Sequence, residues 1–241
     1  VAGGTTWLKS IPYYDDDYRV VQTQSDNNKG GVDRVSTLYD FAGRVLKTKM
    51  THPTSVAATR TILRWCEYDE TGRLTQAWHK VDSGPEVLLS FNEYNELGQL
   101  VDKKLHSTSS GATDAIQSVD YRYNIRGWLT SINNAELAIN AASNDDTDDL
   151  FGMNLAYQDV LGTGNAGQYN GNISGSKWSV NQGFGDIKAM AYNYSYDPMN
   201  RLTAATHKQA QTLGTWVTGQ FDENGLTYDL NGNIKSLQRK G

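Results

Sequence analysis

Histidines are the side chains of this sequence that come closest to the requirements of a metal site. An imidazole nitrogen is a common zinc ligand, but a site needs several such groups to converge on the ion. The sequence contains neither a His-x-His pair nor a second cysteine beside Cys66. We therefore expect solvent-facing strand positions for the histidines rather than a metal site. They are His52, His79, His106 and His207.

Asn144-Asp145-Asp146-Thr147-Asp148-Asp149 is an acidic segment rich in the oxygen ligands that calcium prefers. Asp149 stands where a calcium loop has its glycine, and the bidentate glutamate that closes such a loop is missing. A solvated loop is the better interpretation, and a weak calcium site is the alternative. The same two interpretations apply, with less support, to Asp15-Asp16-Asp17.

Gly162-Thr163-Gly164-Asn165-Ala166-Gly167 matches the letters of a dinucleotide-binding G-x-G-x-x-G motif. That motif works only between a strand and a helix, and neither is expected here, so a flexible turn is favoured. Cys66 lies in a predicted strand, where a buried thiol is the expectation. We predict no catalytic, cofactor-binding or metal-binding residue and no enzymatic activity.

Composition narrows the class of protein. The chain has 241 residues and a net charge of −5 without a basic run, which argues against a nucleic-acid partner. It has no apolar run of about 18 residues, so membrane insertion is not expected. Frequent Tyr, Thr, Val and Gly favour strands and turns. The best candidate for a helix is short, at residues 134–142.

One seven-residue motif recurs along the chain and defines the elements that hold these side chains. The unit is about 30 residues long, and fixed periods of this kind indicate a modular architecture. A degenerate copy, Tyr169-Asn170-Gly171-Asn172-Ile173, lies in the longest gap. The six full copies are YDFAGRV (39–45), YDETGRL (68–74), YNELGQL (94–100), YNIRGWL (123–129), YDPMNRL (196–202) and YDLNGNI (228–234).

The motif predicts a β-hairpin. Asp69 to Gly72 fit a type I turn, with glycine at the position that takes positive φ before the returning strand. In this register Tyr68 lies opposite Leu74 on one face, and Asp69 lies opposite Arg73 on the other. We expect positive φ at Gly43, Gly72, Gly98, Gly127, Asn200 and Gly232.

The period sets the size of the sheet. It leaves two strands of about 10–11 residues in each hairpin. Hairpins of this kind must stack edge to edge, and the outer edges of the resulting sheet stay open unless something covers them. The repeated Asp/Arg pairs are interpreted as solvated charge at the hairpin ends.

The six copies, together with the order DLFGM (149–153), QYNGNIS (168–174), Trp178 and YDPMNRL (196–202), resemble the RHS (rearrangement hotspot) or YD-repeat family, in particular RHS proteins of Bacteroidetes-type bacteria. The resemblance covers most of the chain, from Tyr39 to Ile234. It implies a β-strip wound into a hollow shell, as in polymorphic toxins, insecticidal toxin complexes and adhesive teneurins. The sequence lacks the family's DPxG-type core-end element and an effector, so we expect a segment of a longer protein.

The predicted fold is all-β: stacked antiparallel hairpins that form a spiral strip, with a leading strand region at 1–30 and the repeat strip at 31–241, including a longer insertion at 130–190. The predicted function is a structural segment of a secreted or cell-surface RHS shell or scaffold associated with toxin encapsulation or delivery. Its partners would be further repeats or an encapsulated effector.

The alternative is an adhesive or carbohydrate-binding module on the same strip, because exposed aromatic rings can stack on sugars. Packing on the inner face is the simpler interpretation of these rings. The tryptophans concerned are Trp65, Trp78, Trp128, Trp178 and Trp216.

Overall fold

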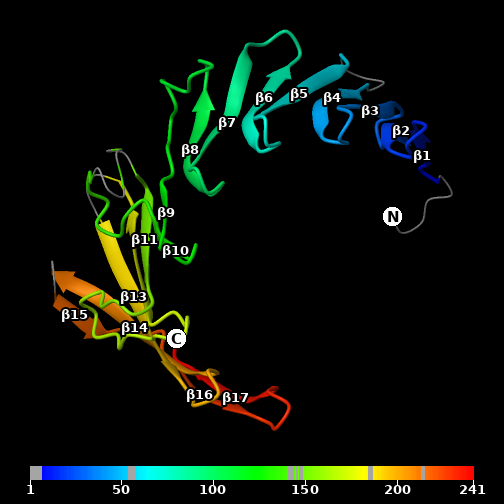
Figure 1. Cartoon of the computed structure of the whole chain (residues 1–241). Coiled ribbons are helices and arrows are strands. Elements are labelled where there is room, and N and C mark those ends of the chain that lie inside the picture. Colours follow the sequence, from blue (N-terminus) through cyan, green and yellow to red (C-terminus); the bar gives the residue numbers. More distant parts are fainter. Residues whose placement is uncertain are drawn as a thin grey trace. The chain divides into compact units, whose positions relative to one another are not determined.

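The computed structural model describes residues 7–53, 58–140, 144, 146, 149–183, 187–212 and 215–241. Within these ranges the chain consists of strands, turns and loops, which confirms the predicted all-β class. All strand pairs are antiparallel, and they form two sheets (Figure 1). The described residues contain no helix able to cross a bilayer.

The first sheet follows the order of the sequence from β1 to β8, so each strand pairs with its neighbours along the chain. Its strands are β1 (Ser10–Tyr14), β2 (Val20–Asp26), β3 (Val32–Tyr39), β4 (Val45–His52), β5 (Arg60–Tyr68), β6 (Leu74–Val81), β7 (Glu86–Tyr94) and β8 (Leu100–Ser107).

The second sheet runs from β9 to β17 in the order β17-β16-β14-β13-β12-β11-β10-β9, and β15 pairs with β14 beside this path. Its strands are β9 (Tyr121–Tyr123), β10 (Leu129–Ile132), β11 (Phe151–Ala156), β12 (Gly175–Asn181), β13 (Ile187–Tyr196), β14 (Leu202–Thr212), β15 (Thr215–Thr218), β16 (Glu223–Tyr228) and β17 (Ile234–Arg239).

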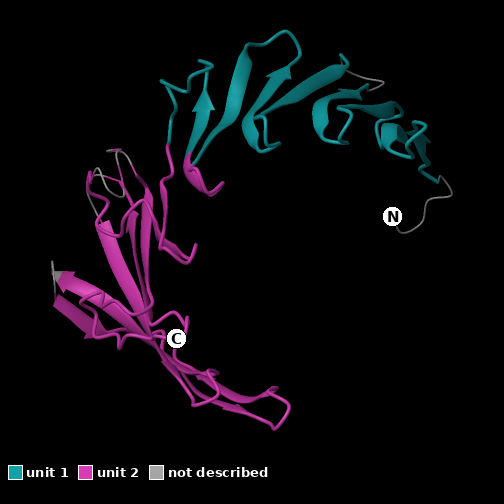
Figure 2. Cartoon of the chain, in the orientation of Figure 1, with its two compact units in different colours: residues 1–94, 103–117 teal, residues 95–102, 118–241 magenta. Residues whose placement is uncertain are grey.

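The chain divides into two compact units, which Figure 2 shows in different colours. Unit 1 contains residues 1–94 and 103–117, and unit 2 contains residues 95–102 and 118–241. Each unit is a stack of hairpins built on the same turn.

The predicted hairpin register is confirmed. Tyr68 pairs with Leu74, and a register shift beside Tyr68 marks the bulge that follows the turn. The same pairing recurs at Tyr39/Val45, Tyr123/Leu129, Tyr196/Leu202 and Tyr228/Ile234. Positive φ is also confirmed, with 85° at Gly43, 86° at Gly72, 81° at Gly98, 77° at Gly127, 63° at Asn200 and 85° at Gly232.

The predicted strand length of 10–11 residues is confirmed for β13 and β14, with 10 and 11 residues, but most other strands are shorter. Most of those in the first sheet have 7 to 9 residues, because the segments between successive hairpins take up part of the period. The motif tyrosines are half-buried where a buried face was expected, since the hairpins of the first sheet form one layer.

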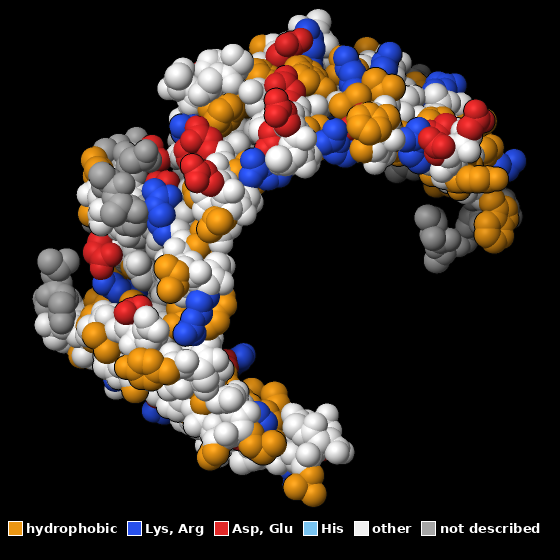
Figure 3. Space-filling model, viewed as in Figure 1, with side chains coloured by type: hydrophobic (Ala, Val, Ile, Leu, Met, Phe, Trp, Pro, Cys, Tyr) orange, Lys and Arg blue, Asp and Glu red, His pale blue; other side chains and the backbone are white. Residues whose placement is uncertain are grey.

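Unit 1 has a small core on one face of its sheet. Trp78 and Leu88 are buried there together with Ala112 of the loop that follows β8. Trp65 stacks on Trp78 with ring centroids 5.8 Å apart. Elsewhere, hydrophobic side chains and charges of both signs share the surface seen in Figure 3. Pairing between hairpins must therefore carry much of the stability of this unit.

In unit 2, two loops pack directly on small residues of the sheet. A β-carbon at Gly152 would lie 1.8 Å from the carbonyl oxygen of Asn134, so the loop backbone rests on the strand. The Ser179 hydroxyl donates to the carbonyl of Ala135 in the same loop. In the second loop, the Thr163 hydroxyl lies 2.7 Å from the side-chain oxygen of Asn193.

The predicted helix at residues 134–142 is wrong for its described part. Residues 134–140 form a turn and a loop. The Asn134 side chain accepts hydrogen bonds from the amides of Glu136 and Ala138, and Leu137 has a φ of 51°. Asparagine side chains that bond nearby backbone compete with helix formation in this way. Ala141 and Ala142 lie outside the described residues.

Gly72→Ala is expected to destabilise the chain by about 1–2 kcal/mol, because an L-residue at this φ is strained. A β-carbon there would also lie 2.6 Å from Nη1 of Arg44, whereas at Gly43 it would meet nothing within 4 Å. Urea denaturation of Gly72→Ala against Gly43→Ala separates the two effects. An equal loss in the free energy of unfolding in both variants would contradict the contact between Arg44 and the turn at Gly72.

Candidate functional site

The recurring turn is the candidate site, because its tyrosine and arginine make the side-chain contacts between one hairpin and the next. Within one turn, an aspartate clamps the arginine four residues later. Oδ1 of Asp69 accepts the backbone amide of Arg73 at 2.9 Å, and Oδ2 accepts Nε of the same arginine at 2.6 Å. The same pair of bonds occurs at Asp40/Arg44 and Asp197/Arg201. In the last copy the Asn233 amide replaces the guanidinium and bonds Asp229 at 2.8 Å.

Successive turns are connected by the motif tyrosine. The Tyr68 hydroxyl donates to the carbonyl of Val45, the aliphatic residue that ends the preceding motif, at 2.9 Å. This bond reaches from one hairpin to its neighbour, whereas the strand register fixes the tyrosine within its own hairpin. The other examples are Tyr39 to Val20, Tyr94 to Leu74, Tyr157 to Leu129, Tyr196 to Ile173 and Tyr228 to Leu202.

The clamped arginine completes the contact by covering the tyrosine of the next hairpin. Cζ of Arg44 lies 5.0 Å from the ring centroid of Tyr68, a cation–π distance. Equivalent distances are 5.3 Å for Arg19 over Tyr39, 4.8 Å for Arg73 over Tyr94 and 4.6 Å for Arg201 over Tyr228. Hydroxyl, ring and guanidinium form one unit, here called the tyrosine lock. The Asp/Arg pairs thus have a second role that solvated charge does not describe.

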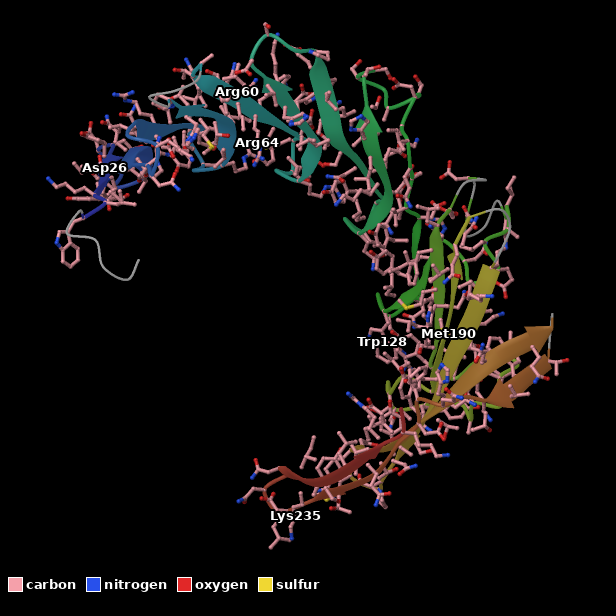
Figure 4. The ribbon with its side chains drawn as sticks, turned by 180° about the vertical axis from the view of Figure 1, so that it is seen from behind. Asp26, Arg60, Arg64, Trp128, Met190 and Lys235 are labelled. Carbon is pink, nitrogen blue, oxygen red and sulfur yellow. The ribbon has the colours of Figure 1, made fainter. Side chains whose placement is uncertain are left out.

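Two copies keep the geometry with other chemistry. In one, Nδ2 of Asn95 bonds the Gln99 side-chain oxygen at 2.9 Å, so an amide pair replaces the ion pair. In the other, Trp128 stands in the arginine position, and its ring centroid lies 5.0 Å from that of Tyr157. Figure 4 labels Trp128 near the turn between β9 and β10. An aromatic pair can therefore replace the cation–π contact.

A seventh copy of the motif was hidden in the segment 14–20. Asp15 clamps Arg19 through the Arg19 amide at 2.9 Å and through Nε at 2.7 Å. Tyr18 takes the glycine position with a φ of 60°. Asp16 and Asp17 are exposed, as expected for a solvated loop, whereas Asp15 is a turn residue that clamps Arg19. Tyr14, Asp15, Arg19 and Val20 have the motif spacing, and the tyrosine in place of glycine concealed it.

The degenerate copy was only half correctly placed. Tyr169 is 79% exposed, and Tyr157 makes the lock in its place. Gly171 and Ile173 do hold their predicted positions: Gly171 has a φ of 99° against Trp128, and the Ile173 carbonyl accepts Tyr196. An inserted loop thus separates the tyrosine from the rest of its motif.

The clamp also sets the ionisation of the turn carboxylates. Burial tends to raise the pKa of Asp69, but hydrogen bonds from the Arg73 amide and guanidinium and from Thr71 outweigh it and hold the pKa well below its usual range. For Asp15 and Asp197 the leading cause of a lowered pKa is the hydrogen bond from the arginine amide. This stabilisation is complete above about pH 4 and is lost as the pH falls further.

Histidines do not share one environment. His52 lies on β4 with Nδ1 2.7 Å from Oδ1 of Asp33, and His106 is exposed with a φ of 55°. His207, which was expected to face solvent, is buried at 2% exposure. The described residues contain no group of three or more side chains placed to hold a metal ion.

His207 packs in an aromatic cluster of unit 2. Its ring centroid lies 5.2 Å from Tyr192 and 5.3 Å from Phe221, and Trp178 stacks on Tyr192. Nδ1 is buried without a hydrogen-bond partner against Gly219, where a β-carbon would lie 1.7 Å away. Burial lowers the pKa of His207, and the charge of Asp222 only partly opposes this effect.

A cavity of about 880 Å³ adjoins this cluster in unit 2. Its wall includes the apolar side chains of Met190, Trp216 and Phe221, and Figure 4 labels Met190 on β13. Lys177 and Glu136, also in the wall, form an ion pair. The volume falls in the range of small-molecule sites.

The acidic segment is only partly described, and neither predicted interpretation fits that part. Asn144 and Asp149 are buried at 0% and 3% exposure. The two Asp149 oxygens accept the side-chain amides of Asn133 and Asn144, each at 2.6 Å. Asp149 therefore organises a loop from the inside. Asp145, Thr147 and Asp148 lie outside the described residues.

The glycine-rich segment 162–167 belongs to a loop held by buried side chains, where a flexible turn was expected. Thr163 and Asn165 are buried, and Nδ2 of Asn165 donates to the Asp159 carbonyl and to the Ser174 hydroxyl. Cys66 is a free, half-buried thiol on β5. The five tryptophans named as a sugar platform all have aromatic or cationic partners within the chain.

Comparison with one solved structure supports the fold. No family model matches the sequence, and no curated protein matches it. The chain is similar to TcdB2-TccC3 without its hypervariable C-terminal region, with a TM-score of 0.51 and 14% identity over 97% of this chain. It is also similar to the Tc holotoxin pore of Photorhabdus luminescens, with a TM-score of 0.38 and 12% identity over 90% of the chain. It spans only 14% and 13% of those chains.

Tyr68→Phe should cost about 1 kcal/mol, because it removes one hydrogen bond and keeps the ring under Arg44. Tyr169→Phe is the matched control, since Tyr169 is 79% exposed and lies outside the lock. Chemical denaturation of both variants gives the difference. Equal stability of Tyr68→Phe and the control would contradict a stabilising role for the Tyr68 hydroxyl in the lock.

His207→Phe should flatten the pH dependence of stability. The folded pKa of His207 is lowered from 6.5, so the unfolded chain binds a proton first as the pH falls. Stability from the neutral ring is complete above pH 6.5 and is lost below it. We expect the parent chain, but not the variant, to lose this stability as the pH falls below about 6.5. If urea titrations show the same loss in the free energy of unfolding for the parent chain and for His207→Phe, a buried neutral imidazole at His207 is contradicted.

Proposed function

We propose that this chain is a non-enzymatic structural segment of an RHS-type β-shell or scaffold, outside the cell or at its surface, associated with toxin encapsulation or delivery. The observation that carries the proposal is the tyrosine lock. It joins one hairpin to the next through the tyrosine hydroxyl and, in four copies, through an arginine over the tyrosine ring, and it gives each hairpin an edge to which another can be added.

The similarity to TcdB2-TccC3 supports this proposal through the fold. The match covers 97% of this chain and 14% of the other chain, which is consistent with the proposal that this chain is one segment of a larger β-shell. The resemblance of the motif copies to RHS proteins is the basis for proposing a shell and an enclosed effector. The partners in this proposal are further repeats of the same kind and an encapsulated effector.

The sheets have the open edges that such a segment needs. All residues of β1 and of β17 are exposed, and the two strands are the terminal strands of their sheets. Terminal strands with unpaired backbone groups recruit other strands. The five tryptophans already contact partners within the chain, which favours a scaffold over a sugar-binding platform.

Light scattering on the purified chain tests the open-edge proposal. We expect association that grows with protein concentration, because β17 is an exposed terminal strand, whereas Pro12 opposes unspecific pairing at β1. Leu237→Lys should reduce this association, since edge lysines oppose strand pairing. Circular dichroism should show the same β-content in both proteins. A strictly monomeric parent chain at high concentration would overturn the proposal of an open segment.

A further inference from the structure

The exposed edge at β1 carries half of a tyrosine lock. Tyr14 pairs with Val20 in the same register as the other motif tyrosines, and its turn is fixed by the Asp15/Arg19 clamp. Yet Tyr14 is 57% exposed, whereas the six tyrosines whose hydroxyls bond the preceding hairpin are half-buried. They are Tyr39, Tyr68, Tyr94, Tyr157, Tyr196 and Tyr228.

We propose that the β1 edge is a docking site for a β-hairpin whose motif arginine covers the Tyr14 ring and whose next residue offers its carbonyl to the Tyr14 hydroxyl. This inference rests on the proposed function and names the chemistry of the partner. It continues an interface that the chain already contains: Arg44 and Val45 of β4 meet Tyr68 in this way.

The contact must be specified by side chains more than by backbone. Pro12, in the middle of β1, has no amide hydrogen and so removes one donor from the strand. Proline at an edge strand also discourages unspecific pairing. Tyr14 is therefore the group that selects the partner, through its ring and its hydroxyl.

The partner chemistry points away from a second copy of this chain joined through its last hairpin. That hairpin has Asn233 where most motif copies with an aspartate have arginine, and the Asn233 amide is bonded to Asp229. An asparagine cannot reach over Tyr14 as a guanidinium does. The occupant we infer is a hairpin with arginine in the sixth position of its motif.

The β3–β4 hairpin supplies a suitable probe. A second copy of residues 32–52 can be placed directly before Val1 of the full chain, so that residues 1–9 connect it to β1. Residues 53–59 make the corresponding connection between β4 and β5, so the nine-residue link is long enough. Tethering makes the docking intramolecular and raises the effective concentration of the hairpin.

Hydroxyl-radical footprinting of Tyr14 by mass spectrometry reads the result, with the exposed Tyr169 as internal reference. We expect the added hairpin to lower the reactivity of Tyr14 severalfold, to the level of Tyr39 and Tyr68. R44A in the added copy should restore most of the reactivity. R34A in the added copy is the control and should leave the protection intact, because Arg34 takes no part in the lock.

Unchanged Tyr14 reactivity in the fused chain, or equal protection by the R44A copy, would overturn the docking site. Protection of Tyr14 in the unfused chain at rising concentration would also overturn it, because a second copy would then be the occupant. Failure here leaves concentration-dependent association through other edges intact, so the proposed function and this inference are tested separately.

Discussion

One hydrogen bond between neighbouring hairpins organises this chain: the motif tyrosine hydroxyl donates to the carbonyl that ends the preceding motif. The first sheet has a small core, so inter-hairpin contacts must supply what a second layer would otherwise give. The aspartate serves this bond indirectly. It fixes the arginine, and the arginine then lies over the ring whose hydroxyl makes the bond. Local turn chemistry and sheet assembly therefore depend on the same residues.

The two units use the same turn but cover their strands differently. In unit 1, Trp78, Leu88 and the following loop form a small apolar core. In unit 2, loops rest directly on small residues of the sheet, and buried asparagines and Asp149 satisfy their backbone and side-chain groups. Buried polar groups are tolerated when they are hydrogen-bonded. The loop layer of unit 2 is thus specified by polar geometry, whereas the core of unit 1 is specified by apolar packing.

Much of the fold could be predicted from the sequence because the turn is a local device. Asp69, Gly72 and the Tyr68/Leu74 register follow from turn geometry alone. The lock could not be foreseen, since it joins residues of different hairpins and depends on how they stack. Tyr18 concealed a whole copy by occupying the glycine position, and Tyr157 was separated from its motif by a loop. The burial of His207 has the same origin, because contacts with other strands decided it. The false helix at Asn134 has a local cause, since the Asn134 side chain accepts the amides of Glu136 and Ala138.

The displaced tyrosine has a consequence for protein engineering. The Tyr157 hydroxyl bonds the preceding hairpin, and the Ile173 carbonyl accepts the tyrosine of the next one. An irregular segment separates these two residues, whereas the corresponding residues of a regular motif lie within seven positions. The entropic cost of lengthening a loop grows only slowly with its length. Foreign peptides could therefore be grafted between the tyrosine and the glycine of other turns. Each graft would leave the tyrosine in its strand, so such a chain could display several unrelated epitopes at regular intervals.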